Sequence, residues 1–223
     1  MNQDLLELIK DYAINEHTDV NAGLLGKSKD NLISMLIDLL TKYFNDVNSS
    51  SMRELVVAMV AGYTPRFEKL GYNGYRHNTL TGKVEQCEIK PPNFRTDSTA
   101  KQPKKLNGGG NFTDYTWEKF NRHKDENPKM LIGGFVDGRL IYILGFDFNE
   151  EDFLSKLEDQ LWKRFPTGSD VIGQYLRSAQ FSYIHYKNSV SLEIVYSRKR
   201  DELFRAKPFI VKDLFTYLLS VAR

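Results

Sequence analysis

The stretch Lys83-Val84-Glu85-Gln86-Cys87-Glu88-Ile89-Lys90-Pro91-Pro92 decides how the rest of the sequence is interpreted. Apolar and polar residues mix along it, a Thr-Gly pair precedes it and two prolines prevent it from continuing, which together predict a β-strand. Alternate residues of a strand share a face, so Cys87 and Ile89 are expected to point into a core. Gln86, Glu88 and Lys90 then point toward solvent or a cleft. A carboxylate and an amine on one strand face form a compact charged site, although such pairs also occur on ordinary solvated faces.

The composition bounds the class of protein. With 223 residues, of which 41% are hydrophobic and 27% charged, the chain is typical of a globular protein with a sizeable core. No apolar run approaches the roughly 20 residues that span a bilayer, and the N-terminus lacks a signal-peptide layout, so a cytoplasmic protein without membrane contact is expected. The single cysteine, Cys87, excludes an internal disulfide framework. The formal net charge of +2 is too small to indicate a nucleic-acid partner by itself.

The residues just before the strand predict its partner. The segment from 71 to 78 runs toward a turn at 79 to 82, which indicates an antiparallel hairpin. If residues 80 and 81 form its tip, Asn73 lies across from Glu88 and Tyr75 lies across from Gln86. A slip of one residue would move every side chain to the other face.

Apolar residues at helical spacing predict helices on both sides of this hairpin, three of them before it, with a loop between the first two. The helical region of residues 1 to 70 is expected to pack on the core or to mediate dimerisation. The predicted helices span residues 4–15, 28–43, 52–61, 113–124, 153–165 and 211–222.

Further strands are predicted downstream. Two near-continuous apolar runs, 130–136 and 140–146, are joined by Asp137-Gly138, which is a strong hairpin signal, and their apolarity indicates that both faces are covered. A second hairpin is expected from strands at 181–186 and 190–196. The sequence therefore predicts an α/β fold, an α+β sandwich with a central mixed β-sheet flanked by helices, in one compact domain.

Two basic segments, at about 91–111 and 185–207, are candidate loops for binding a polyanion. The first has no periodicity and contains three consecutive glycines, and irregular loops of this length are usually functional or disordered. Basic, polar loops suit a polyanion, and most of their side chains are expected to contact phosphate rather than base edges. The candidates are Arg95, Lys101, Lys104, Lys105, Asn107 and Asn111 in the first segment and His185, Lys187, Asn188, Arg198, Lys199 and Arg200 in the second.

The order of helices, hairpin, basic loop, helix and apolar strand resembles that of the PD-(D/E)xK nucleases, and within them the type II restriction endonucleases of the PvuII and EcoRV kind. Cys87-Glu88-Ile89-Lys90 matches the second half of the family motif, and Asn127-Pro128-Lys129 resembles the corresponding PvuII region. The resemblance covers roughly residues 54 to 146. It implies a restriction-endonuclease-like fold with a catalytic core at 71–223.

One departure from the family pattern concerns an aspartate that normally precedes the acid of the motif. Residues 70 to 83 contain no Asp or Glu. Asn73, favoured by the hairpin register, Asn78, favoured by PvuII-like spacing, or His77 would have to take that place with a neutral ligand. The number of metal ions is therefore left open.

The resemblance implies Mg²⁺-dependent hydrolysis of DNA. Glu88 would hold the metal, joined by a helix glutamate, Glu54 or Glu68, and Lys90 would contact the scissile phosphate and help to orient or deprotonate the attacking water. Because type II enzymes cut palindromic double-stranded sites, a homodimer is implied.

Two other functions remain open. One is a non-catalytic DNA-binding or regulatory protein on a degenerate nuclease fold, and the other is a repair or phage nuclease that recognises DNA structure. No nucleotide cofactor is expected, because Gly108-Gly109-Gly110 lacks the Lys-Ser/Thr that completes a phosphate loop.

Overall fold

The computed structural model describes residues 2–45, 50–66, 71–78, 82–96, 98 and 104–221. A mixed sheet runs through its centre in the order β1-β2-β3-β6-β7-β9, with β4 pairing with β6 at the end of β3. The pairs of β3 with β6 and of β4 with β6 are parallel, and the other neighbours are antiparallel. The strands are β1 (Thr64–Pro65), β2 (Gly74–His77), β3 (Val84–Lys90), β4 (Asn93–Phe94), β6 (Lys129–Val136), β7 (Arg139–Asp147) and β9 (Glu193–Ser197).

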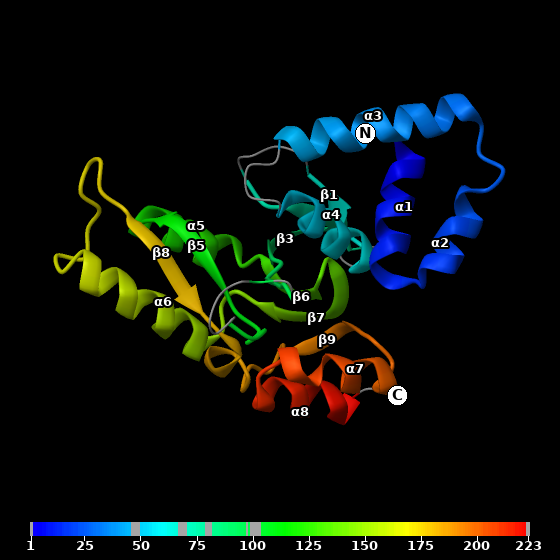
Figure 1. Cartoon of the computed structure of the whole chain (residues 1–223). Helices are drawn as coiled ribbons and strands as arrows, with labels where there is room; N and C mark the ends of the chain where they lie inside the picture. The colour runs from blue at the N-terminus through cyan, green and yellow to red at the C-terminus, as the bar shows by residue number, and fades with distance from the viewer. Residues whose placement is uncertain are drawn as a thin grey trace.

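One face of the sheet is covered by α1 (Gln3–Ile14) and α4 (Ser51–Val60), as Figure 1 shows. Cys87 and Ile89 of β3 point into this layer and are fully buried there with apolar side chains of α4 and β6. Two further helices, α2 (His17–Leu24) and α3 (Lys29–Asn45), lie outside α1 and contact it rather than the sheet.

The other face carries a larger, aromatic-rich layer. A two-stranded antiparallel ribbon of β5 (Gly110–Tyr115) and β8 (Leu176–Phe181) lies over it. The helical elements of this side are α5 (Trp117–Glu126), α6 (Glu151–Arg164), η1 (Tyr183–His185), α7 (Arg200–Ala206), η2 (Lys207–Phe209) and α8 (Lys212–Val221). Because Glu88 and Lys90 alternate with Cys87 and Ile89, they point into this layer.

The predicted mixed sheet with flanking helices is confirmed. The antiparallel pairing of the central hairpin and its register are confirmed as well. Tyr75 pairs with Gln86 and Gly74 pairs with Cys87, which is the expected register. The hairpin of β6 and β7 is also present, with positive φ angles of 47° at Asp137 and 78° at Gly138.

Two predictions from residue 113 onward were wrong. The predicted helix at 113–124 begins only at Trp117, after Thr116, whose hydroxyl accepts from Lys119 N and caps the helix. Residues 110 to 115 instead form β5, because they pair with β8. The predicted hairpin of 181–186 with 190–196 does not form, since β8 pairs with β5 and β9 pairs with β7.

The three predicted N-terminal helices are present as α1, α3 and α4. The structure differs from the prediction in the segment that connects the first two. Residues 17 to 24 were expected in a loop but form α2, which ends before Gly26 with its positive φ of 89°. Ser28 accepts from Asn31 N and caps α3 as predicted. None of the described helices is long and apolar enough to cross a membrane.

Candidate functional site

The centre of the candidate site is the pair of Glu88 and Lys90 on β3. Lys90 Nζ donates to Glu88 Oε1 at 2.7 Å, and the side chains of Lys90 and Glu88 are only 19% and 13% exposed. The strand places both on one face, and the flanking Cys87 and Ile89 anchor the opposite face in the core. A charged pair this far removed from solvent loses hydration, which a substrate or a metal ion could replace.

Strand β5 forms a wall beside Lys90. Lys90 Nζ lies 4.6 Å from the centre of the Phe112 ring, a cation–π contact. Gly110, at the start of β5, lies so close that a Cβ added there would be 2.6 Å from Lys90 Cβ and 2.7 Å from Cγ. Glycine at 110 therefore makes room for the Lys90 side chain.

Asn73 lies at the same end of the hairpin and joins β3 to α4. Its Oδ1 accepts from Ile89 N at 2.7 Å, and its Nδ2 donates to Glu54 Oε2 at 3.1 Å. The structure thus brings Asn73 and Glu54 together next to the residue that follows Glu88. The amide oxygen of Asn73 is already used by the backbone, so Asn73 serves here to hold Glu54 and β3 in place.

Asn78 and His77 lie toward the other end of the hairpin. Asn78 N donates to Lys83 O at 2.9 Å, and His77 pairs with Val84. At about 3.4 Å per residue, Asn78 is therefore roughly 17 Å along the strand from Glu88. The structure does not place either residue beside the Glu88 and Lys90 pair, and Glu68 lies outside the described residues.

His123 of α5 lies beside this site and was not among the predicted site residues. It is buried, its Nδ1 lies 3.1 Å from Tyr115 Oη, and its ring packs against Phe112 and Phe148. Burial lowers the pKa of His123 to about 4, with the charge of Glu88 acting in the opposite direction. In the sequence, His123 follows Phe120 by three residues and therefore lies on the apolar side of the predicted helix, which indicated that it could be buried.

A small cavity of about 200 Å³ opens beside His123. The Tyr72 hydroxyl in its wall is buried, and the carboxylate of Glu126 lies nearby. Burial raises the pKa of Tyr72, and the nearby carboxylate of Glu126 adds to the effect. The lining residues are Gly71, Tyr72, Gln86, Arg122, His123 and Glu126.

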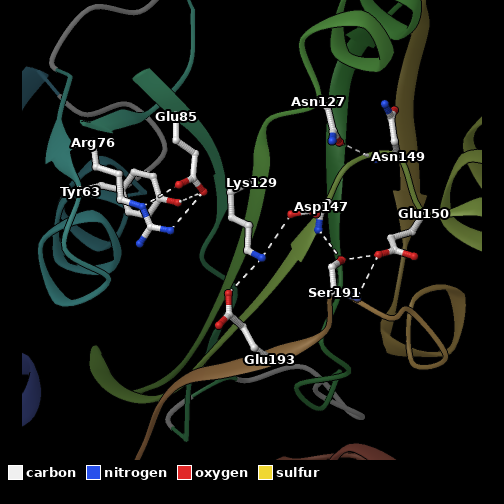
Figure 2. A network of polar contacts seen from close by, with 10 residues as sticks. All are labelled: Tyr63, Arg76, Glu85, Asn127, Lys129, Asp147, Asn149, Glu150, Ser191 and Glu193. Carbon is white, nitrogen blue, oxygen red and sulfur yellow. Dashed lines mark hydrogen bonds and ion pairs between the residues drawn. The ribbon is translucent and has the colours of Figure 1, made fainter. Parts of the chain in front are cut away.

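A second polar network lies on the opposite face of β3, and Figure 2 shows it from close by. Glu85 accepts from Tyr63 Oη at 2.6 Å and from Arg76 Nε at 2.7 Å. Burial of Glu85 opposes ionisation, but these hydrogen bonds from Arg76 and Tyr63 lower its pKa overall. The same alternation that points Glu88 to the aromatic layer points Glu85 to the α4 side.

Lys129 ties together three strands beside that network. Its Nζ lies 3.2 Å from Asp147 Oδ1 and 3.0 Å from Glu193 Oε1, which belong to β7 and β9 (Figure 2). Asp147 N donates in turn to Ser191 Oγ at 2.9 Å, and Ser191 donates to Glu150. These contacts hold the register of β6, β7 and β9, so the role of Lys129 in this structure is to stabilise the sheet.

Arg198 does not fit its predicted role as a DNA contact, because it lies in the protein interior. It is 6% exposed, and its guanidinium donates to the carbonyls of Ala13, Ile14 and Leu140. Glu202 lies 2.9 Å from Arg198 Nη1. Arg198 therefore fastens the C-terminal end of α1 to β7.

The other predicted DNA contacts are mostly surface residues, and Lys101 lies outside the described part of the chain. His185 is half-buried and its Nδ1 takes part in the turn with Ser182. The exposed candidates are Arg95, Lys104, Lys105, Asn107, Asn111, Lys187, Asn188, Lys199 and Arg200.

Parts of the two predicted loops meet. Asn107 O accepts from Tyr183 N at 2.9 Å, and Gly108 O accepts from the Tyr186 hydroxyl. Leu106 pairs with Ile210 next to α8. Lys104 and Lys105 therefore lie on the side of the C-terminal helices, together with the loop that carries Lys187 and Asn188.

A metal ion would have few protein ligands at this site. Among the described residues, no group of three His, Cys, Asp or Glu side chains converges as a metal cluster would. Glu88 lies on β3, and Glu54 lies on α4, where Asn73 holds it. This donor set fits Mg²⁺, which commonly takes one or two carboxylates and completes its shell with water and substrate phosphate.

No protein-family model matches the chain, and no curated protein matches it.

Proposed function

We propose that this protein is a Mg²⁺-dependent endonuclease that hydrolyses phosphodiesters of double-stranded DNA, as a homodimer at a palindromic site and with a restriction-endonuclease-like fold. The observation that carries the proposal is the Glu88–Lys90 pair on one face of β3, 2.7 Å apart, at the end of the hairpin where Asn73 holds Glu54. An acid and a lysine on one strand face suit metal-assisted phosphodiester hydrolysis, because the acid would hold the metal ion and the lysine would contact the phosphate.

Each residue has a distinct part in the proposed reaction. The ammonium of Lys90, held over Phe112, donates hydrogen bonds to a non-bridging phosphate oxygen and to the attacking water. Glu88 and Glu54 would hold Mg²⁺, which would stabilise the charge that develops on the phosphate and lower the pKa of a bound water. Asn73 keeps Glu54 in position and leaves the Ile89 amide paired.

The surface chemistry supports a polyanionic substrate. Exposed lysines of the first loop, Lys104 and Lys105, lie on the same side of the molecule as Lys187 of the second loop. Arg122 lies on α5 at the cavity next to His123. Such residues would neutralise phosphates, so the affinity for DNA should fall steeply with salt.

The direct test is incubation of the purified protein with plasmid DNA of known sequence, in Mg²⁺ and in EDTA. Discrete fragments that require Mg²⁺ are expected. A Mg²⁺-dependent smear would instead indicate a repair or end-processing nuclease. Intact DNA in both lanes with a retarded band on a native gel would indicate the non-catalytic DNA-binding protein, and would overturn the proposed activity.

A further inference from the structure

Helix α3 exposes apolar side chains to solvent along one side. Leu32, Ile33, Leu36, Ile37 and Leu40 are between 39% and 57% exposed. They follow the spacing i, i+1, i+4, i+5 and i+8, so they form one continuous stripe, which is called the α3 stripe below. Large apolar residues grouped in this way on a soluble surface mark an interaction site.

The polar side of α3 faces the protein. Asp38 Oδ2 accepts from Asn2 N at 2.6 Å, and Asn31 donates to Asp4 of α1. Met35 is buried on the same side. Figure 1 shows α3 lying across the N-terminal end of α1, away from the sheet. These contacts fix α3 in an orientation in which its apolar side is turned outward, the reverse of an ordinary surface helix.

We propose that the α3 stripe is a self-association surface, on which α3 of a second copy of this chain packs antiparallel about a two-fold axis next to Leu36. The stripe fits itself in this arrangement, because Leu32 and Leu40 lie one turn before and one turn after Leu36. An antiparallel pair therefore sets Leu32 against Leu40 of the partner subunit and Leu36 against the partner subunit's Leu36. The stripe carries no charge that would require an oppositely charged partner.

The length of the helix suits the centre of an interface. The 17 residues of α3 span about 25 Å, and a standard interface covers roughly 800 Å² on each partner. The helix pair would supply the apolar core of that area. Leu25, in the connection to α3, is also highly exposed.

The inference rests on the proposed function only for the expectation of a two-fold dimer, since palindromic DNA needs two related active sites. The surface itself is argued from α3 alone. Its test is therefore the oligomeric state, which is measured without DNA or Mg²⁺.

The first experiment is size-exclusion chromatography with light scattering over a series of protein concentrations. The wild type is expected to be a dimer. Leu36→Asp should raise the dissociation constant of the dimer by about 100-fold or more, since each dimer would bury two new carboxylates. Ile172→Asp is the matched control, because Ile172 is fully exposed in a loop away from α3 and should leave the dimer intact. Circular dichroism verifies that both variants are folded.

The second experiment identifies the partner surface. Leu36→Cys should form an intermolecular disulfide on mild oxidation, whereas Ile172→Cys should not, and the native Cys87 is buried and does not interfere. Leu36→Glu and Leu36→Lys should each be monomeric and should form a mixed dimer when combined.

A monomeric wild type, or a dimer that Leu36→Asp leaves unchanged, would overturn the α3 inference. Lys90→Ala should remain a dimer, so loss of cutting and loss of pairing are separate results.

Discussion

Asn73 Nδ2 donates a hydrogen bond to Glu54 Oε2 at 3.1 Å, which links the central hairpin to the helix that covers it. The same amide accepts from Ile89 N through Oδ1. One neutral side chain therefore joins the hairpin to the helix, and it orients a carboxylate that comes from α4. Asn78, which precedes Glu88 by ten residues, lies toward the other end of the hairpin.

Asn73→Ala should therefore weaken both the fold and the site. The Ile89 amide would lose its partner, at a cost of about 1–3 kcal/mol in the free energy of unfolding, and Glu54 would lose its orienting donor, so Mg²⁺-dependent cleavage should slow. Asn78→Ala is the control and should change cleavage little. The measurements are urea unfolding and the initial rate of plasmid cutting. Slower cutting by Asn78→Ala alone would contradict the assignment.

Lys90→Ala should abolish cutting while DNA binding remains. Removing the ammonium takes away a donor to the developing phosphate charge, so the cleavage rate should fall by about 100-fold or more. Gel-shift titrations with Ca²⁺ in place of Mg²⁺ would measure binding. Lys163→Ala, on the exposed side of α6, removes an equal charge elsewhere and should cut normally. Cutting retained by Lys90→Ala would remove Lys90 from the mechanism.

Gly110→Ala should disturb Lys90 indirectly. The new Cβ would lie 2.6 Å from Lys90 Cβ, so the lysine side chain or β5 has to shift, with a loss of about 1–3 kcal/mol in stability and slower cleavage. Gly23→Ala is the comparison, because nothing lies within 4 Å of a Cβ at that helical position. Its stability should rise by up to about 1 kcal/mol. Equal behaviour of the two variants would show that the close approach of β5 to Lys90 is unimportant.

Arg198→Ala should behave as a stability mutation. The buried guanidinium satisfies the carbonyls of Ala13, Ile14 and Leu140, and its removal leaves them without a donor, at a cost of about 2–4 kcal/mol in the free energy of unfolding. Lys199→Ala, the exposed neighbour, should change stability by less than about 0.5 kcal/mol. If Arg198→Ala were as stable as the wild type but bound DNA more weakly, the result would contradict the structural role and support a direct contact of Arg198 with DNA.

The stability of the protein should fall between pH 6.5 and pH 4 because of His123. Burial lowers the pKa of His123 from 6.5 to about 4, so the unfolded chain binds this proton more readily than the folded one. The contribution of neutral His123 to the free energy of unfolding is fully present above pH 6.5. It is lost as the pH falls toward 4, which lowers the free energy of unfolding by about 3 kcal/mol. His123→Phe should flatten this part of the profile of unfolding free energy against pH. The exposed His77 serves as the control, and a slope unchanged by His123→Phe would exclude His123 as its source.

Local patterns of the sequence were sufficient for the elements whose partners lie nearby in the chain. The turn at Asp137-Gly138 fixes the β6–β7 hairpin, and the alternation around Cys87 fixes both the central hairpin and the face on which Glu88 and Lys90 lie. These features depend on turn chemistry and on a period of two, which neighbouring residues encode by themselves.

Tertiary structure decided what depends on pairing between distant segments. β5 could be recognised as a strand only through its pairing with β8, more than 60 positions later, and local apolar spacing suggested a helix in its place. The same limit applied to Arg198, whose charge suggested a surface although the carbonyls of Ala13, Ile14 and Leu140 hold it inside. The sequence by itself determined which side chains share a strand face. Only the packing of distant elements decided that Asn73 meets Glu54 and that His123 lies behind Phe112, because these contacts gain their energy from burial that no local segment provides.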